Sequence, residues 1–205
     1  ELGDRRIMAR SLHHLTSIYS YQGNEEMSFD CATRSYNIFK ELGDKAGIAA
    51  TQKSLAWYFM DKNEFDSTLV YLTRALEVQE EIDDKRGMGS SLHNIGMVHH
   101  YKGDYDKALD YYDRSLAIDE EIGDKRGMGI SLNNIGNMHG DKGDYDKALD
   151  YYARALAIRE EIGDKRRIGW SCRNVGWLYY LMGEYEKSIE NYDRELSIKK
   201  DLNDN

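Results

Sequence analysis

Asparagine recurs at one position of this 205-residue chain, at intervals of 40 residues. Asn94, Asn134 and Asn174 occupy that position. An asparagine amide both donates and accepts hydrogen bonds, so it can pair with the N–H and the C=O of an extended peptide backbone. The same amide can instead hydrogen-bond to a neighbouring helix. The sequence leaves both roles open.

A second set of candidate binding residues lies beside these asparagines, at positions that differ between similar stretches of the chain. Residues 83–122 and 123–162 agree at 30 of 40 positions. Five of the mismatches, counted from Ser90 and Ile130, have the spacing i, i+3, i+7, i+10 and i+11. This spacing follows one stripe of a helix. A stripe that varies between otherwise fixed residues indicates a binding surface.

This variable stripe carries all three tryptophans of the chain, and aromatic side chains are favoured anchors at interfaces. A large residue at the edge of the stripe can instead pack on an adjacent helix. The stripe also brings positive charge into an acidic protein, which favours a ligand with carboxylates. The candidate contacts, asparagines included, are Lys53, Trp57, His93, Asn94, Met97, Tyr101, Asn134, Asn137, Arg173, Asn174, Trp177 and Tyr180.

Residues that could catalyse a reaction or bind a metal ion form no recognisable motif. Histidines are adjacent at 13–14 and at 99–100. Neighbouring residues on a helix point about 100° apart, so one helix cannot readily direct both rings at a single ion. No serine or cysteine stands in a nucleophile motif, and no glycine-rich phosphate loop occurs. We therefore expect no metal, no cofactor and no enzymatic activity.

Paired helices are the elements that must position these residues. One amphipathic helix is predicted over about 125–141, because its apolar residues have 3/4 spacing. Gly143 and Asp144 then supply a left-handed C-cap and the N-cap of a second helix over 145–162. The residues with the 3/4 spacing are Met128, Leu132, Ile135 and Met138.

The same helix pair recurs with a 40-residue period, and such a period is typical of stacked repeats. Each unit of a stack buries its apolar face only against its neighbours. We expect one array of five units, at about 3–42, 43–82, 83–122, 123–162 and 163–202. The chain starts and stops at the same repeat phase without a polar capping helix, so we expect a fragment of a longer array.

The pattern of each unit resembles the tetratricopeptide repeat (TPR) family. The resemblance implies an all-α, right-handed superhelical solenoid of five helix-turn-helix units, whose first helices line a concave groove. It also implies that an asparagine at the position of Asn134 commonly holds a peptide backbone. The matching residues of one copy are Leu132, Ile135, Gly136, His139, Gly143, Asp144, Tyr145, Ala148, Tyr152, Ala155 and Leu156.

Two departures from the usual family pattern point to a subgroup. Glutamate stands at 80, 120 and 160, where the family usually has proline. The unit has 40 residues, against about 34 in the common form. This longer unit is similar to those of kinesin light chains, Pins/LGN-type scaffolds and bacterial signalling proteins.

Composition narrows the classes of partner. The net charge of −9 argues against a nucleic-acid partner, which normally demands a basic face. No apolar stretch approaches the length of a membrane span, and no signal peptide opens the chain. Cys31 and Cys172 are expected to be reduced thiols. We therefore expect a cytoplasmic protein that binds neither membrane nor nucleic acid.

These expectations combine into a non-enzymatic module that recognises an extended protein or peptide segment, with acidic segments favoured. One alternative is a regulatory or sensor segment of a larger signalling protein, which contacts its own effector domain. Another is an array that associates end to end through its uncapped terminal repeats.

Overall fold

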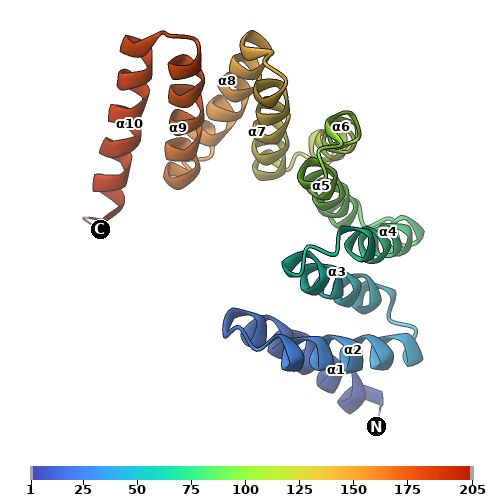
Figure 1. The fold of residues 1–205 in the computed structure, drawn as a ribbon. Coiled ribbons are helices and arrows are strands. Elements are labelled where there is room, and N and C mark those ends of the chain that lie inside the picture. The colour runs from blue at the N-terminus through green and yellow to red at the C-terminus, as the bar shows by residue number, and fades with distance from the viewer. Residues whose placement is uncertain (1, 204–205) are drawn as a thin grey trace. The chain divides into compact units, whose positions relative to one another are not determined.

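The computed structural model describes residues 2–203, which form ten α-helices and no strand (Figure 1). The predicted helices at about 125–141 and 145–162 agree with α7 and α8 to within one residue, and the all-α array of paired helices is confirmed. The helices are α1 Leu2–Tyr21, α2 Glu25–Glu41, α3 Lys45–Asp61, α4 Phe65–Glu81, α5 Lys85–Tyr101, α6 Tyr105–Glu121, α7 Lys125–Asp141, α8 Tyr145–Glu161, α9 Lys165–Leu181 and α10 Tyr185–Asn203.

These helices belong to two compact units, Glu1–Asp104 and Tyr105–Asn205, which are described separately below. In the first unit each helix from α1 to α5 packs against the next one in the chain. In the second unit the same holds from α6 to α10. We refer to these two halves of the chain as unit 1 and unit 2, and to each 40-residue helix pair as a repeat.

Short turns connect the helices, and the recurring Gly-Asp pairs lie in these turns. Gly43 and Gly143 adopt positive φ angles of 64° and 83°, a region that a Cβ atom disfavours. The Asp124 side chain accepts a hydrogen bond from the backbone N–H of Gly127 at 3.0 Å and so caps α7. The predicted cap by Asp144 is wrong in one respect. Asp144 stands at the N-cap of α8, but its side chain makes no capping hydrogen bond.

The apolar positions of the pattern form the core. In unit 2, Ala148, Tyr152 and Leu178 are buried in one cluster. Gly136 permits close packing of α7 on α8, because a Cβ atom there would lie 2.7 Å from the Tyr152 ring. The small residues of the repeat therefore set the distance between helices, and the stripe residues are left outside the core.

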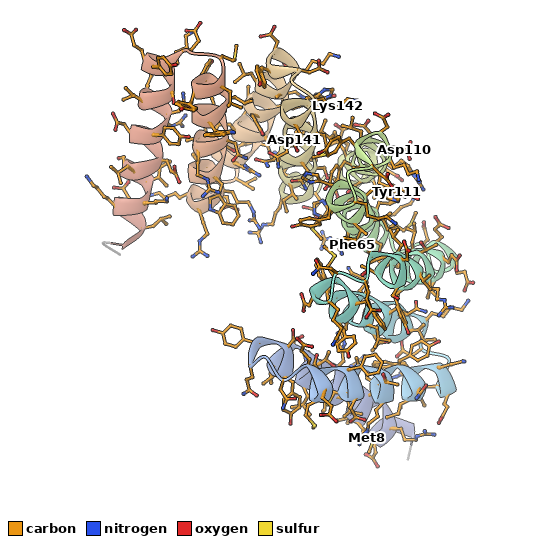
Figure 2. All side chains as sticks on the ribbon, viewed as in Figure 1. Met8, Phe65, Asp110, Tyr111, Asp141 and Lys142 are labelled. Carbon is orange, nitrogen blue, oxygen red and sulfur yellow. The ribbon has the colours of Figure 1, made fainter. Side chains whose placement is uncertain are left out.

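Several ion pairs link the ends of neighbouring helices at a sequence separation of 36 residues. Lys45 Nζ lies 2.7 Å from Glu81 Oε2, and Lys142 Nζ lies 2.8 Å from Asp106 Oδ1. Figure 2 labels Lys142 just beyond the C-terminal end of α7, next to Asp141. Such exposed pairs contribute little stability individually, typically below about 1 kcal/mol.

Candidate binding site

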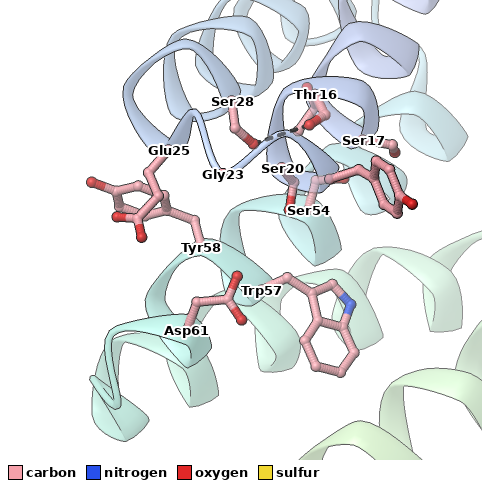
Figure 3. Close-up of a pocket in the computed structure, with 11 residues that line it drawn as sticks. Thr16, Ser17, Ser20, Gly23, Glu25, Ser28, Ser54, Trp57, Tyr58 and Asp61 are labelled. Atoms are coloured by element: carbon pink, nitrogen blue, oxygen red, sulfur yellow. Dashed lines mark hydrogen bonds between the residues drawn. The ribbon is translucent and has the colours of Figure 1, made fainter.

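Trp57 on α3 borders the clearest cavity of unit 1 (Figure 3). Its side chain is 42% exposed although it belongs to a packed helix. The cavity has a volume of about 440 Å³ and lies between α1, the start of α2 and α3. Serine and threonine hydroxyls line it together with the carboxylates of Glu25 and Asp61. No lysine or arginine contributes to this lining.

Trp57 also lies beside two of the other predicted contacts. Trp57, Asn94 and Met97 border one small depression between α3 and α5. Asn94 is only 8% exposed, so its amide is largely withdrawn from the surface. The structure thus brings these three residues together and leaves Trp57 as the most accessible of them.

Lys53 and His93 also lie close together on α3 and α5. Lys53 Nζ donates a hydrogen bond to Ser90 Oγ at 2.7 Å. Burial, with a smaller contribution from the Lys53 charge, lowers the pKa of His93 to about 4. The imidazole is therefore neutral near pH 7. The positive charge expected from this pair is carried by Lys53 alone.

Tyr101 marks the end of α5 and is 61% exposed. Its ring lies parallel to that of Phe65, with the centroids 6.4 Å apart. A side chain of this kind offers one aromatic face and packs with the other. Tyr101 is therefore accessible, but it sits at the rim of unit 1 rather than beside Asn94.

In unit 2 the predicted contacts on α9 form an exposed aromatic row. Trp177 and Tyr180 are 53% and 51% exposed, and their stacked rings have centroids 5.4 Å apart. Arg173 lies one turn before Trp177 and is exposed as well. These three side chains have the i, i+4, i+7 spacing of one helical face.

The asparagines of unit 2 take part in contacts between helices. Asn174 Nδ2 donates a hydrogen bond to Asn133 Oδ1 at 3.3 Å, which links α9 to α7. Asn137 Oδ1 accepts a hydrogen bond from Tyr152 Oη at 2.6 Å. Asn134 is half-buried and has interactions of its own within the protein. For Asn174, the bond to a neighbouring helix is the alternative that the sequence had left open.

One variable position that sequence reasoning missed is buried rather than exposed. It lies near the ends of α2, α4, α6 and α8, four residues before the turn that follows each of these helices. Its occupants differ in charge, although each is 3–6% exposed. The charge reversal from Asp119 to Arg159 is one of the ten mismatches between adjacent copies, and it was the available signal. The buried occupants are Phe39, Gln79, Asp119 and Arg159.

Each polar occupant of this buried position contacts the serine of the next first helix. Ser91 Oγ donates a hydrogen bond to Gln79 Oε1 at 2.7 Å. Ser131 Oγ lies 3.3 Å from Asp119 Oδ2. Burial and the nearby Asp124 raise the pKa of Asp119 to about 6, although the hydrogen bond from Ser131 opposes this shift.

Arg159 makes the largest set of contacts at this position. Its guanidinium donates hydrogen bonds to Asn133 Oδ1 at 3.0 Å, to the Gly129 carbonyl at 3.0 Å and to the Arg167 carbonyl at 3.2 Å. It also bonds to Ser171 Oγ. Burial and the Arg167 charge lower the pKa of Arg159 to about 10, so the side chain is charged at pH 7.

Within residues 2–203, no three histidine, cysteine, aspartate or glutamate side chains are arranged so that they could hold a metal ion. No helix in the described part of the chain is long and apolar enough to cross a membrane. The two cysteines are buried free thiols, and burial raises the pKa of each.

Known structures share the fold. A Podosopora anserina protein with nearly identical TPR-like repeats, described as a kinesin light chain, is 15% identical, with a TM-score of 0.77 and 96% of each chain covered. A STAND protein with a TPR sensor from Pyrococcus horikoshii is 20% identical, with a TM-score of 0.80, over 91% of this chain and 30% of that one. A Rap protein complexed with Competence and Sporulation Factor is 17% identical, with a TM-score of 0.75, over 97% of this chain and 66% of the other.

The chain therefore spans less than two thirds of the STAND and Rap proteins. No curated protein matches the chain. The sequence profile of the tetratricopeptide repeat matches residues 58–121 and 127–201. This match covers more than half of the chain. The chain belongs to the tetratricopeptide repeat family.

Proposed function

We propose that this chain is a non-enzymatic module that binds an extended protein segment through the exposed aromatic residues of its first helices. The observation that carries this proposal is the exposure of Trp57 and Trp177, which are 42% and 53% exposed at equivalent repeat positions. Tryptophan is costly to leave in water and is enriched at interaction hot spots. Each of the two anchors belongs to a different compact unit.

A preformed helical surface supports this function energetically. The two helices that carry the tryptophan anchors, α3 and α9, each pack against a neighbour on both sides, so the protein loses little conformational entropy when it binds. A flexible ligand then bears most of the ordering cost. Lys53 and Arg173 favour carboxylates near these anchors. TPR arrays generally serve as non-catalytic scaffolds for protein interactions, which agrees with this mechanism.

Affinity capture from extracts of the source cells tests the proposal. The immobilised wild-type chain is compared with Trp57→Ala, with Trp177→Ala and with Val70→Ala. Val70 is an exposed apolar residue on the second helix α4 and serves as the matched control. We expect a partner that the wild type and Val70→Ala retain and that a tryptophan variant loses. Equal retention by all four proteins would contradict the proposal.

A second candidate function is regulation within a larger protein, where the array contacts an effector domain of its own chain. The likeness to a STAND protein with a TPR sensor favours it, because the similar region covers only 30% of that protein. Chemical cross-linking in the full-length natural protein tests this candidate. Cross-links between the first helices and another domain would support it, and their absence would count against it.

A further inference from the structure

Unit 2 contains a second cavity, which lies apart from the aromatic row on α9. It has a volume of about 610 Å³ and is formed by the start of α7, the turn between α8 and α9, the first turns of α9 and the end of α10. None of the predicted contacts lines it. Its lining includes Arg126, Lys165, Arg166, Arg167, Trp170 and Leu202.

The charge of this cavity is opposite to that of the protein as a whole. Four cationic side chains line it, against the single carboxylate of Asp164. That carboxylate is already engaged, because it forms an ion pair with the Arg167 guanidinium and accepts a hydrogen bond from the Arg167 backbone N–H at 3.1 Å. Although burial acts to raise the pKa of Asp164, the bonds from Arg167 and the charges of Arg167 and Arg126 hold it below its ordinary value.

Arg126 is held less tightly than its counterpart in unit 1, although its charge still acts on Asp164. At the equivalent junction of unit 1, Arg6 Nε lies 3.2 Å from Asp44 Oδ2, and the arginine is neutralised. Gly47 stands there at the position of Arg167. In unit 2, Arg167 forms the ion pair with the equivalent aspartate, Asp164. Arg126 and Arg166 form no ion pair with a carboxylate among the described residues.

A fifth cation lies behind the wall of the cavity. Arg159 is 4% exposed and bonds to the backbone carbonyl of Arg167. Its hydrogen-bond acceptors are amide, carbonyl and hydroxyl oxygens, none of which is a carboxylate. A buried charge is weakly screened, so Arg159 adds to the positive potential at the cavity. Its Nε atom has no hydrogen-bond partner in the protein.

Trp170 gives the cavity an apolar wall. The indole is 45% exposed, whereas the equivalent positions in the preceding copies hold Arg10, Ala50, Ser90 and Ile130. A wall of this kind suits the aliphatic or aromatic part of a side chain whose charged end meets the arginines. Guanidinium groups match the geometry of phosphate and carboxylate oxygens.

We propose that this cavity binds a doubly charged anionic group of a peptide, with Arg126 and Arg166 as charged partners and Trp170 as the apolar wall. A phosphorylated side chain and two adjacent carboxylates share this chemistry. The inference rests on the proposed function, because it assumes that the ligand is a peptide. It adds a site that is distinct from the tryptophan anchors at 57 and 177.

Fluorescence anisotropy with three labelled synthetic peptides tests this site. The peptides have identical leucine-containing flanks and differ at a central pair, which is phosphoserine-serine, Glu-Glu or Ser-Ser. We expect at least one anionic peptide to bind at least about tenfold more tightly than the Ser-Ser peptide, as for charge-assisted hydrogen bonds. Preference for phosphoserine or for Glu-Glu identifies the source of the charge, and either preference supports the site. Failure of both anionic peptides to bind overturns it.

Variants locate the binding within unit 2. Arg126→Gln and Arg166→Gln should each weaken binding of the anionic peptide by about tenfold. Arg154→Gln is the matched control, because it removes the same charge from an exposed position on α8. It should change the affinity by less than about twofold. Equal affinity for Arg126→Gln, Arg166→Gln and Arg154→Gln would overturn the site.

This design separates the two proposals. A captured partner that depends on Trp57 or Trp177, combined with peptides that fail to bind, removes the anion site and leaves the proposed function intact. Peptide binding that depends on Arg126 and Arg166, without any captured partner, supports the anion site and counts against the proposed function.

Discussion

The cavity beside Trp57 and the cavity beside Trp170 differ in charge, although related repeats build both. The first is lined by hydroxyls and by the carboxylates of Glu25 and Asp61. The second is lined by four cations. The first cavity lies at the C-terminal ends of α1 and α3, whereas the second lies at the N-terminal ends of α7 and α9. The two cavities are therefore lined by different positions of the repeat. A repeat scaffold of constant backbone can therefore offer surfaces of opposite sign within one chain.

A buried position of the repeat also carries either sign of charge within unit 2. Asp119 and Arg159 stand at equivalent places in α6 and α8, and they carry opposite charges at less than 7% exposure. The aspartate contacts one serine hydroxyl, whereas the arginine bonds to four acceptors. The contrast between acidic and basic junctions leads to four expected outcomes.

The largest effect is expected from Arg159→Ala, which removes the buried cation. Four acceptors lose this donor, two of them in buried hydrogen bonds, so the free energy of unfolding should fall by about 3 kcal/mol. Urea denaturation measures this loss. Arg154→Ala, an exposed arginine of the same helix, should cost less than about 0.5 kcal/mol. A loss below about 1 kcal/mol for Arg159→Ala would show that the bonds of this junction contribute little.

The second prediction concerns the pH dependence of the Asp119 junction. The folded-state pKa of about 6 lies above the ordinary value of 3.8. The folded protein therefore binds the proton more tightly than the unfolded chain, and this contribution is present at low pH and lost as the pH rises through 6.

The comparison with Asp119→Asn isolates this contribution from other titrating groups. The difference in unfolding free energy, wild type minus variant, should rise by about 2 kcal/mol between pH 7 and pH 4.5. Urea denaturation at both values measures it. A parallel pH dependence for the two proteins would mean that Asp119 titrates as an exposed carboxylate does.

A smaller effect is expected from Arg167→Gly, which restores the residue found in the other junctions. Asp164 then becomes available to Arg126, as Asp44 is to Arg6. The affinity for the anionic peptide should fall by about tenfold, as for Arg126→Gln, since one cation is removed and Arg126 becomes paired with Asp164. Fluorescence anisotropy with the same peptides measures the change. Unchanged affinity would show that Arg126 does not contact the anion.

The smallest effect concerns stability and distinguishes exposed anchors from core residues. Trp57→Ala and Trp177→Ala should each lower the Tm by less than about 4 °C, because about half of each side chain is already exposed to water. Differential scanning calorimetry measures this shift. A decrease above about 10 °C would show that the tryptophans act mainly in packing.

Sequence reasoning predicted the backbone and much of the surface. The 3/4 spacing and the Gly-Asp turns placed α7 and α8 to within one residue, because local propensity and capping act over a few neighbours. The stripe correctly located exposed aromatic side chains such as Trp177. Asn94 was harder to judge, because its burial depends on the packing of α5 against α4.

The rest depended on contacts between distant residues. Asp119 and Arg159 have the types of surface residues, and only the assembled junction shows that they are buried. That Asp164 forms its ion pair with Arg167 rather than with Arg126 could not be predicted from either residue alone. The neutral state of His93 likewise follows from its burial beside Lys53. No local pattern in a sequence carries this information.

The first helices α3, α5, α7 and α9 begin every 40 residues, from Lys45 to Lys165. This regularity has a consequence for how the gene of a repeat protein can change. Loss of 40 codons in frame, for example those for residues 123–162, would leave helix lengths and turns intact. It would also join α6 directly to α9, so that Asp119 faces the place where Arg167 and Ser171 stand. The backbone tolerates the removal of a copy, but the buried charges make the order of copies matter.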